Sequence, residues 1–207
     1  MTGLRDNGRR ELILRTAASL IRERGFERTS VRHIAEAAGI TSGSLFYYFE
    51  SKEELLVAIM EEGVRDIMKS VREGLEGESR LPERLLAMLR HHLTSLLGPK
   101  LDAMSVVLYE WRSLSPPARA RVLSARDDYE DLWMLPLGEA AALGLVDADT
   151  VLVRQTVLGA LNWATQWYRP GGRLDIDALA RSLFLLLLPR VAGRAASSSF
   201  HVPMEIK

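Results

Sequence analysis

Residues 29–49 read TSVRHIAEAAGITSGSLFYYF, two short segments with helical spacing on either side of a tight turn. In the first segment, apolar residues recur every three or four positions, at Val31, Ile34, Ala35 and Ala38. Gly39 ends this segment, because glycine readily takes the left-handed conformation that follows many helices. The spacing therefore predicts a helix-turn-helix, preceded by a longer helix that ends near Gly25.

Each of the two short helices has two candidate N-caps. Thr29 or Ser30 begins the first helix, and Thr41 or Ser42 begins the second, which runs through Phe49. All four side chains carry an oxygen that accepts a hydrogen bond from an unpaired backbone N–H of the first turn. The residue types alone leave both choices open.

Four consecutive aromatic residues end the stretch. Leu45 and Phe49 are spaced i, i+4 and are the expected buried anchors of the second helix. Phe46, Tyr47 and Tyr48 then face outward to differing degrees. Two interpretations follow: a small three-helix core in which the aromatics only pack, or a protruding helix that enters the major groove of DNA.

Helical spacing continues along most of the chain, and no alternating strand of convincing length interrupts it. The stripe expected to face inward on the first helix is Leu12, Ile13, Thr16, Ala17, Leu20 and Ile21. We predict an all-α fold of about nine helices, with a three-helix helix-turn-helix head and a larger helical body. The predicted boundaries are 1–52 for the head, 53–192 for the body and 193–207 for a mobile tail.

Composition and charge narrow the classes of function. The chain has 207 residues, no net charge and no cysteine, which excludes disulfides, thiolate metal sites and a thiol nucleophile. Through Lys52, however, nine Lys or Arg residues stand against six acidic residues. The head is therefore net positive within a neutral chain, as phosphate contact requires.

Two other classes of protein find little support. The longest apolar run, 183–188, is far short of the roughly 20 residues that span a bilayer, so we expect a cytoplasmic protein with no membrane partner. An all-α enzyme is the main alternative outside regulation, but no nucleophile, base and orienting group form a set that would support it. We expect no catalytic residue, no metal and no cofactor, because metal-ligand spacing is absent among His33, His91, His92 and His201.

The segment TSVRHIAEAAGITSGSLFYYFESKEELL resembles the DNA-binding signature of the TetR family of transcriptional regulators. The resemblance implies that double-stranded operator DNA is a partner. Phe46 stands where this family usually has tyrosine, and Tyr48 where histidine is common, which removes one phosphate hydrogen bond and alters another contact. The implied DNA-contacting residues are Ser30, Arg32, Thr41, Ser42, Gly43, Ser44, Phe46, Tyr47, Tyr48 and Lys52.

The same resemblance implies a homodimer that reads palindromic operators and pairs through its last two helices. Residues 150–169 (TVLVRQTVLGALNWATQWYR) and 175–191 (DIDALARSLFLLLLPRV) are apolar around most of their circumference. Such helices need cover on nearly every side. A second copy of the chain supplies that cover; alternatively, both helices are central within one monomer.

Aromatic, Met and amide residues in the middle of the body outline an apolar cavity with a few polar groups, typical of a small-molecule site. Taken singly, each of these residues is better explained as ordinary core than as a ligand contact. The candidate ligand-binding residues are Met104, Leu108, Trp111, Arg112, Arg126, Tyr129, Trp133, Asn162 and Trp163.

Two segments of the body, YEWRSLSPPARARVLSARDDYEDLW and LNWATQWYRPGGRLDIDALA, are similar to the TetR-family branch that regulates fatty-acid, aromatic-acid or steroid degradation. Several members of that branch respond to acyl-coenzyme A, which implies a repressor released by an acyl-CoA effector. Arginines near these segments suit CoA phosphates, or they form surface ion pairs. The alternative is a sensor of hydrophobic drugs or aromatic compounds.

Overall fold

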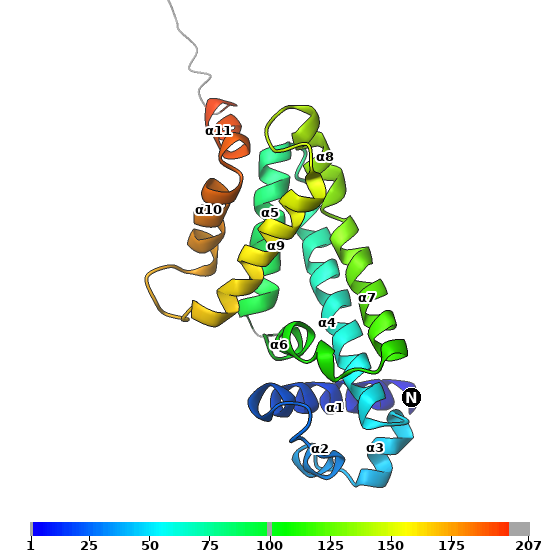
Figure 1. Ribbon diagram of the computed structural model, residues 1–207. Coiled ribbons are helices and arrows are strands. Elements are labelled where there is room, and N and C mark those ends of the chain that lie inside the picture. Colours follow the sequence, from blue (N-terminus) through cyan, green and yellow to red (C-terminus); the bar gives the residue numbers. More distant parts are fainter. Residues whose placement is uncertain (1, 99–100, 199–207) are drawn as a thin grey trace, which may run out of the picture. The chain divides into compact units, whose positions relative to one another are not determined.

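The computed structural model describes residues 2–98 and 101–198, and all the regular structure in these ranges is helical (Figure 1). This confirms the all-α prediction. The helices in chain order are α1 (Thr2–Arg24), α2 (Val31–Ala37), α3 (Ser42–Tyr48), α4 (Lys52–Leu75), α5 (Leu81–Leu97), α6 (Leu101–Tyr109), the 3-10 helix η1 (Trp111–Ser113), α7 (Pro116–Asp131), α8 (Met134–Ala142), α9 (Thr150–Trp167), α10 (Ile176–Leu187) and α11 (Pro189–Ser198).

The described residues form more helices than the predicted number of about nine. The chain leaves the helix at Glu110, and again between α7 and α8, without a Pro or Gly residue at the break. Pro189 adds a third division, because its ring cannot continue the helix of α10. Helix α11 extends into the predicted tail as far as Ser198, and residues 199–207 of that tail lie outside the described residues.

The chain divides into two compact units. Unit 1 comprises Met1–Met68 and Gly98–Tyr129, and unit 2 comprises Lys69–Leu97 and Glu130–Lys207. Helices α4 and α7 each continue from one unit into the other. The predicted head of residues 1–52 is thus part of a larger compact unit that also contains α6, η1 and most of α7.

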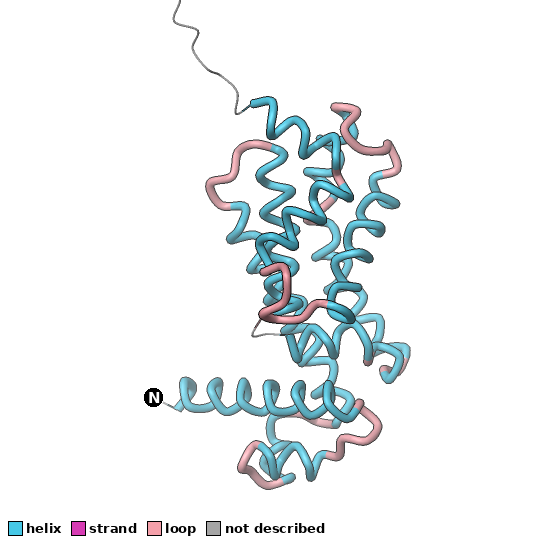
Figure 2. Tube along the Cα trace, turned by 90° about the vertical axis from the view of Figure 1, so that its left-hand side faces the viewer, coloured by secondary structure: helices cyan, strands magenta, loops and turns pink. Residues whose placement is uncertain are grey.

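In unit 1, α1 lies between the α2–α3 pair and α6 (Figures 1 and 2). Its core combines the inward faces of α1 to α4 with Val106, Leu114 and Val122 from the later segment. One expectation for α1 was wrong: Leu12 is exposed, whereas Leu14 is buried. The two positions differ by about 200° around a helix of 3.6 residues per turn, so the buried face is rotated from the predicted stripe.

The caps of the two short helices are resolved. Ser30 is the N-cap of α2, and its hydroxyl accepts the backbone N–H of His33 at 3.1 Å. Thr41 is the N-cap of α3 and accepts the N–H of Ser44 at 3.1 Å. Gly39 has a φ of 65°, as expected of the residue that ends α2. The predicted helix-turn-helix is therefore present with its start and stop signals in use.

In unit 2, α5 is the central helix and packs against α8, α9, α10 and α11. Its buried side chains lie around most of its circumference, as a helix covered by several neighbours requires. Among the described residues, no helix is both long and apolar enough to span a membrane.

Candidate functional site

The outward face of α3 carries exposed aromatic side chains. Leu45 and Phe49 are buried and anchor the helix, as predicted. Phe46 is 50% exposed and Tyr47 is 78% exposed. Tyr48 is half-buried, and its ring meets the Tyr47 ring edge to face at 5.2 Å between centroids. The aromatic cluster is therefore divided between core and surface. A role in packing alone would not require the exposed rings of Phe46 and Tyr47.

Gly43, at the start of α3, has no internal reason to be glycine. A Cβ atom built there meets nothing nearer than the Thr41 hydroxyl at 3.8 Å, which is ordinary contact. Glycine in a helix costs roughly 0.5–1 kcal/mol relative to alanine. A glycine with open space around it is consistent with close approach by another molecule.

The other predicted DNA-contacting residues surround this face. Ser30, Arg32 and Thr41 are exposed, whereas Ser42 and Ser44 are half-buried. The hydroxyls of Ser30 and Thr41 already serve as helix caps.

Lys52, the predicted phosphate-binding lysine, begins α4. Its Nζ atom lies 3.9 Å from the ring centroid of Phe26, a cation–π contact. This contact holds the Lys52 side chain against Phe26. To bind phosphate, the ammonium group must either leave the Phe26 ring or contact the phosphate while it stays on the ring.

The first turn of α4 is fastened to the start of α7 by contacts that sequence analysis missed. Glu53 Oε1 accepts the backbone N–H of Ser115 at 2.6 Å. Arg121 donates to both carboxylate oxygens of Glu54, at 2.8 and 3.3 Å, and pairs with Glu61 at 3.2 Å. These partners are more than 50 residues apart in the chain, and no local spacing signals such pairs. Arg121 is thus committed to carboxylates, as the surface ion-pair interpretation proposed.

Several predicted effector-binding residues lie in unit 1. Met104 is buried and Leu108 is half-buried on α6, but Trp111 stands on η1, beyond the end of that helix. The guanidinium carbons of Arg112 and Arg119 lie 5.5 and 5.1 Å from the Trp111 ring centroid. The exposed indole therefore lies close to two cations, and Arg119 also donates to the backbone carbonyls of Arg112 and Leu114.

Arg126 and Tyr129 both lie on α7, but their side chains differ in burial. Tyr129 is buried, whereas Arg126 is exposed. Of these two predicted cavity residues, Tyr129 therefore shares the buried face of α7 with Val122, and Arg126 does not.

In unit 2, Trp133 and Asn162 both lie against His92, which sequence analysis did not select. The Nε2 atom of His92 donates to the Oδ1 atom of Asn162 at 3.0 Å. The rings of His92 and Trp133 meet edge to face, with centroids 6.1 Å apart. His92 continues the apolar stripe of Leu85, Met88 and Leu89 at helical spacing, and that pattern was the available signal.

Burial governs the charge of both adjacent histidines. Complete burial lowers the pKa of His92 to about 4, so its imidazole is neutral near pH 7. Burial and the neighbouring Arg90 also lower the pKa of His91. His91 lies against α4 instead, where its Nδ1 atom is 3.1 Å from the Ser70 hydroxyl. The two adjacent histidines therefore point in different directions.

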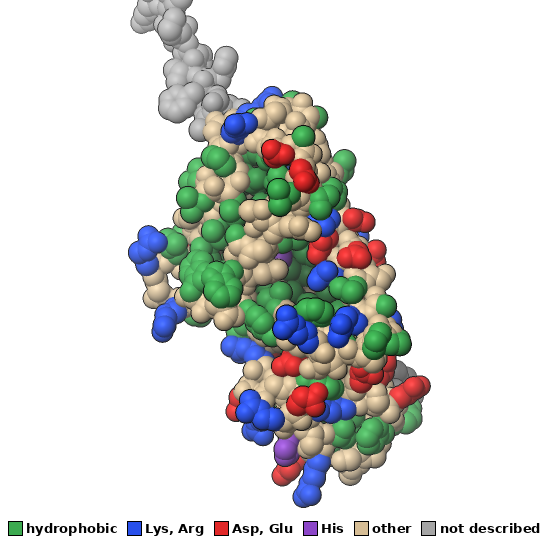
Figure 3. All heavy atoms as spheres, viewed as in Figure 1, with side chains coloured by type: hydrophobic (Ala, Val, Ile, Leu, Met, Phe, Trp, Pro, Cys, Tyr) green, Lys and Arg blue, Asp and Glu red, His purple; other side chains and the backbone are tan. Residues whose placement is uncertain are grey.

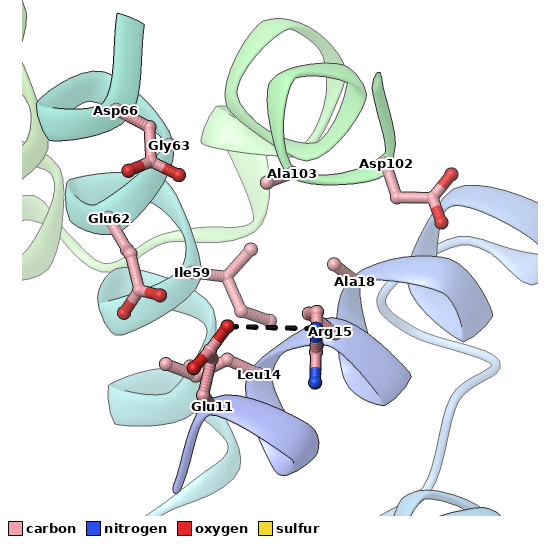
Figure 4. Close-up of a pocket in the computed structure, with 10 residues that line it drawn as sticks. All are labelled: Glu11, Leu14, Arg15, Ala18, Ile59, Glu62, Gly63, Asp66, Asp102 and Ala103. Carbon is pink, nitrogen blue, oxygen red and sulfur yellow. Dashed lines mark ion pairs between the residues drawn. The ribbon is translucent and has the colours of Figure 1, made fainter. Parts of the chain in front are cut away.

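A cavity of about 520 Å³ opens between α1, α4 and α6 within unit 1 (Figure 4). Leu14, Ala18, Ile59, Gly63 and Ala103 supply apolar lining, and the acidic lining residues are Glu11, Glu62, Asp66 and Asp102. Three of these acids are paired with arginines at 2.8–3.6 Å. Arg15 also lines the cavity, but the arginines of these three pairs are already held by carboxylates, so they are not free to bind the phosphates of coenzyme A. Among the described residues, no group of His, Cys, Asp or Glu has an arrangement that could hold a metal ion.

Apolar side chains remain exposed on α9 and α10 of unit 2, where Figure 3 shows hydrophobic groups gathered. Trp163 is 65% exposed, although its neighbour Asn162 is turned toward His92. The exposed large apolar residues of these two helices are Val151, Leu152, Trp163, Trp167, Leu185 and Leu186. Exposed apolar area of this extent is typical of an interaction surface.

Two family models match the chain. Residues 13–59 match "Bacterial regulatory proteins, tetR family", and residues 78–191 match "Tetracyclin repressor-like, C-terminal domain". This chain belongs to the TetR family. The first match contains the helix-turn-helix of this TetR-family protein, and the second contains the His92 cluster and the exposed faces of α9 and α10.

Three similar proteins illustrate the family. The HTH-type transcriptional repressor KstR2 of Rhodococcus jostii (strain RHA1) is 33% identical over 196 residues, which cover 90% of this chain and 93% of the relative. The crystal structure of AibR in complex with isovaleryl coenzyme A and operator DNA matches with 30% identity and a TM-score of 0.80, covering 87% of this chain and 98% of AibR. The crystal structure of superantigen PfiT matches with 46% identity and a TM-score of 0.76, covering 87% and 96% of the two chains.

Proposed function

We propose that this TetR-family protein is a dimeric, ligand-responsive repressor that binds palindromic operator DNA and is released by an acyl-CoA-type effector. The observation that carries the DNA assignment is the outward face of α3, with Tyr47 exposed and Gly43 open. Named relatives are a repressor and a protein crystallised with operator DNA, and neither is described as an enzyme. A DNA-binding regulator of this kind acts in the cytoplasm.

The reading surface consists of the ten residues named above as DNA contacts. Tyr47 reaches furthest from the protein and is the expected contact with base edges, sugar or phosphate. Arg32 and Lys52 supply positive charge for the backbone, and the exposed N-terminus of α3 adds N–H groups that favour phosphate. Two copies of this surface, about one DNA turn apart or somewhat more, fit successive major grooves.

The dimer rests on the exposed apolar residues of α9 and α10. In one chain, each helix buries one face against its neighbours and leaves the other uncovered. A second copy placed by a two-fold axis covers identical residues on both chains. This arrangement accounts for apolar residues on opposite sides of the same helices.

An acyl-CoA effector matches two features. The complex of AibR with isovaleryl coenzyme A supports the chemical class, because AibR is 30% identical over nearly its whole length. In unit 1, the guanidinium groups of Arg112 and Arg119 lie close to the exposed Trp111 indole and supply two cations suited to phosphate. A ligand releases DNA only by binding the DNA-incompetent state more tightly, and tenfold discrimination corresponds to about 1.4 kcal/mol.

Operator binding is tested by selecting duplexes from a randomised library and measuring fluorescence anisotropy. Tyr47→Ala is expected to weaken binding of the selected duplex about 10- to 100-fold, while helicity and dimer mass stay unchanged. Tyr109→Ala is the control, since Tyr109 is also exposed in unit 1 but lies outside α2 and α3. Failure to select any duplex at low salt would remove the DNA assignment. PfiT, described as a superantigen, shares this fold, so the fold alone does not decide the question.

The effector class is tested by adding a panel of compounds to the operator complex. Medium- and long-chain acyl-CoAs and phenylacetyl-CoA are expected to release the duplex, and the corresponding free acids are not. Release by uncharged aromatic compounds instead would favour the sensor of hydrophobic drugs. No release by any thioester overturns the acyl-CoA assignment and leaves the operator result standing.

A further inference from the structure

Unit 2 contains a buried polar cluster at the junction of α5, α8 and α9. It consists of His92 on α5, Trp133 at the start of α8 and Asn162 on α9. Trp133 is fully buried and His92 is 2% exposed. The three helices otherwise bury apolar side chains such as Leu89, Leu137 and Leu161. Polar groups in such surroundings require hydrogen-bond partners.

Two members of the cluster satisfy each other, and the third does not. His92 donates to Asn162 at 3.0 Å. The Nε1–H of Trp133 has no hydrogen-bond partner among the described residues. Buried indoles usually find an acceptor, because an unsatisfied buried donor costs about 1–3 kcal/mol. The free protein therefore holds a donor in its interior with no acceptor from its own described residues.

The chemistry of the cluster limits which groups can accept a hydrogen bond from this N–H. An indole N–H donates and cannot accept, so the missing partner is an acceptor. The adjacent imidazole carries no charge near neutral pH, because burial lowers its pKa to about 4. With no cation in the cluster, a carboxylate would lose its hydration without compensation. A neutral carbonyl oxygen within an apolar ligand meets both conditions.

We infer that the Nε1–H of Trp133 binds the thioester carbonyl oxygen of the effector, and that the neutral cluster thereby selects acyl thioesters over free acids. This inference rests on the proposed acyl-CoA function and identifies which atom of the effector unit 2 recognises. Trp133 is thus a specificity-determining residue. His92 and Asn162 hold the surrounding polar network and keep it uncharged.

The test compares an acyl-CoA with the matching S-alkyl-CoA thioether, in which a methylene replaces the carbonyl. Calorimetry on the wild-type protein is expected to show the thioester binding at least 10-fold more tightly, which is about 1.4 kcal/mol. Trp133→Phe keeps the ring and removes the N–H. In this variant the two ligands should differ by less than about twofold, since the donor that distinguishes them is gone.

The thermal stability of Trp133→Phe shows whether the Trp133 N–H serves ligand recognition or only the structure of the free protein. If the N–H is unpartnered in the free protein, Trp133→Phe should unfold at the same temperature as wild type or higher. A second measurement needs no variant: with ¹⁵N-labelled tryptophan, the Trp133 indole proton should shift downfield with the thioester and not with the thioether.

Equal wild-type affinity for the two ligands, or an unchanged preference in Trp133→Phe, would overturn the inference while leaving the effector class intact. A destabilised variant together with an indole proton that ignores the thioester would overturn it too. Wild-type protein that binds neither compound would instead overturn the acyl-CoA assignment itself, and this inference with it.

Discussion

Units 1 and 2 place their polar and apolar groups in opposite ways. Unit 1 covers its anchors Leu45 and Phe49 with its own chain and offers tyrosine, serine and arginine outward around α3. Unit 2 leaves Leu185 and Leu186 uncovered, yet encloses His92 and its partners.

The difference matches what each unit is proposed to bind. A surface that reads a hydrated polyanion needs exposed donors and cations on a completed core. A unit that pairs with its own copy needs apolar surface outside, and one that holds an apolar ligand needs a few polar groups inside. Each of the following predictions substitutes a residue in one of the two units and so tests this difference.

The largest effect is expected from charging the uncovered face of unit 2. Leu186→Glu should weaken dimerisation on the order of 1000-fold, about 4 kcal/mol, because symmetry buries the carboxylate twice. Sedimentation and operator anisotropy measure it. Leu135→Glu on α8 is the matched control, since Leu135 and Leu186 are 76% and 75% exposed. Equal behaviour of the two variants would assign the dimer interface elsewhere.

The next effect concerns the enclosed groups of unit 2. The unfolded chain protonates His92 near its ordinary pKa of 6.5, whereas the folded pKa is about 4. Because the unfolded state then binds more protons, His92 lowers the free energy of unfolding as pH falls from 6.5 toward 4, by about 3 kcal/mol in total.

His92→Gln removes this titration and keeps a side chain that hydrogen-bonds. Denaturant unfolding at pH 7 and pH 4.5 should therefore show a smaller loss of stability in the variant than in wild type. Identical pH profiles would mean that His92 is not buried and neutral. His91 is unchanged in both proteins, so its own contribution cancels.

A smaller effect is expected at Gly43 on the outward face of α3, where one substitution should raise stability and lower operator affinity. Gly43→Ala should raise the free energy of unfolding by about 0.5–1 kcal/mol, because alanine favours the helix and open space surrounds the site. Operator affinity should fall about tenfold if DNA approaches the backbone here. Gly138→Ala on α8 has similar open space and should stabilise without affecting DNA. Undiminished operator binding by Gly43→Ala would remove this position from the interface.

The smallest effect is expected from the surface ion pairs of unit 1. Arg121→Ala breaks the exposed pairs with Glu54 and Glu61 and should cost at most about 1 kcal/mol of stability. Any loss of operator affinity should be a few-fold and should shrink with added salt. Arg154→Ala, in the less exposed pair with Glu130 of unit 2, should cost more stability and show weaker salt dependence.

Local signals predicted the helix-turn-helix because its caps, stop residue and anchors all lie within 21 residues. Ser30, Thr41 and Gly39 act where their residue types indicated. Periodicity was less reliable for α1, where neighbouring helices decide that Leu14 and not Leu12 is covered. It also failed at Trp111, which was predicted to line the effector cavity with Met104 and Leu108 but stands on η1, beyond the end of α6.

The site in unit 2 depends on contacts that sequence spacing does not encode. His92 and Asn162 are 70 positions apart, and their hydrogen bond follows from the packing of α5 on α9. Trp133 was selected as a pocket residue, but its unpartnered N–H is visible only in three dimensions. The hydrogen bond from the Ser115 backbone N–H to Glu53 was missed because its partners are also far apart in the sequence.

The most direct test of the account is whether operator and effector affinities are linked. The affinity of an acyl-CoA is measured by calorimetry for the free dimer and for the dimer saturated with its selected duplex. Because linkage is reciprocal, the acyl-CoA should bind the DNA complex more weakly by the same factor by which it weakens operator binding, about 10-fold or more. Equal effector affinity with and without the duplex would contradict the account.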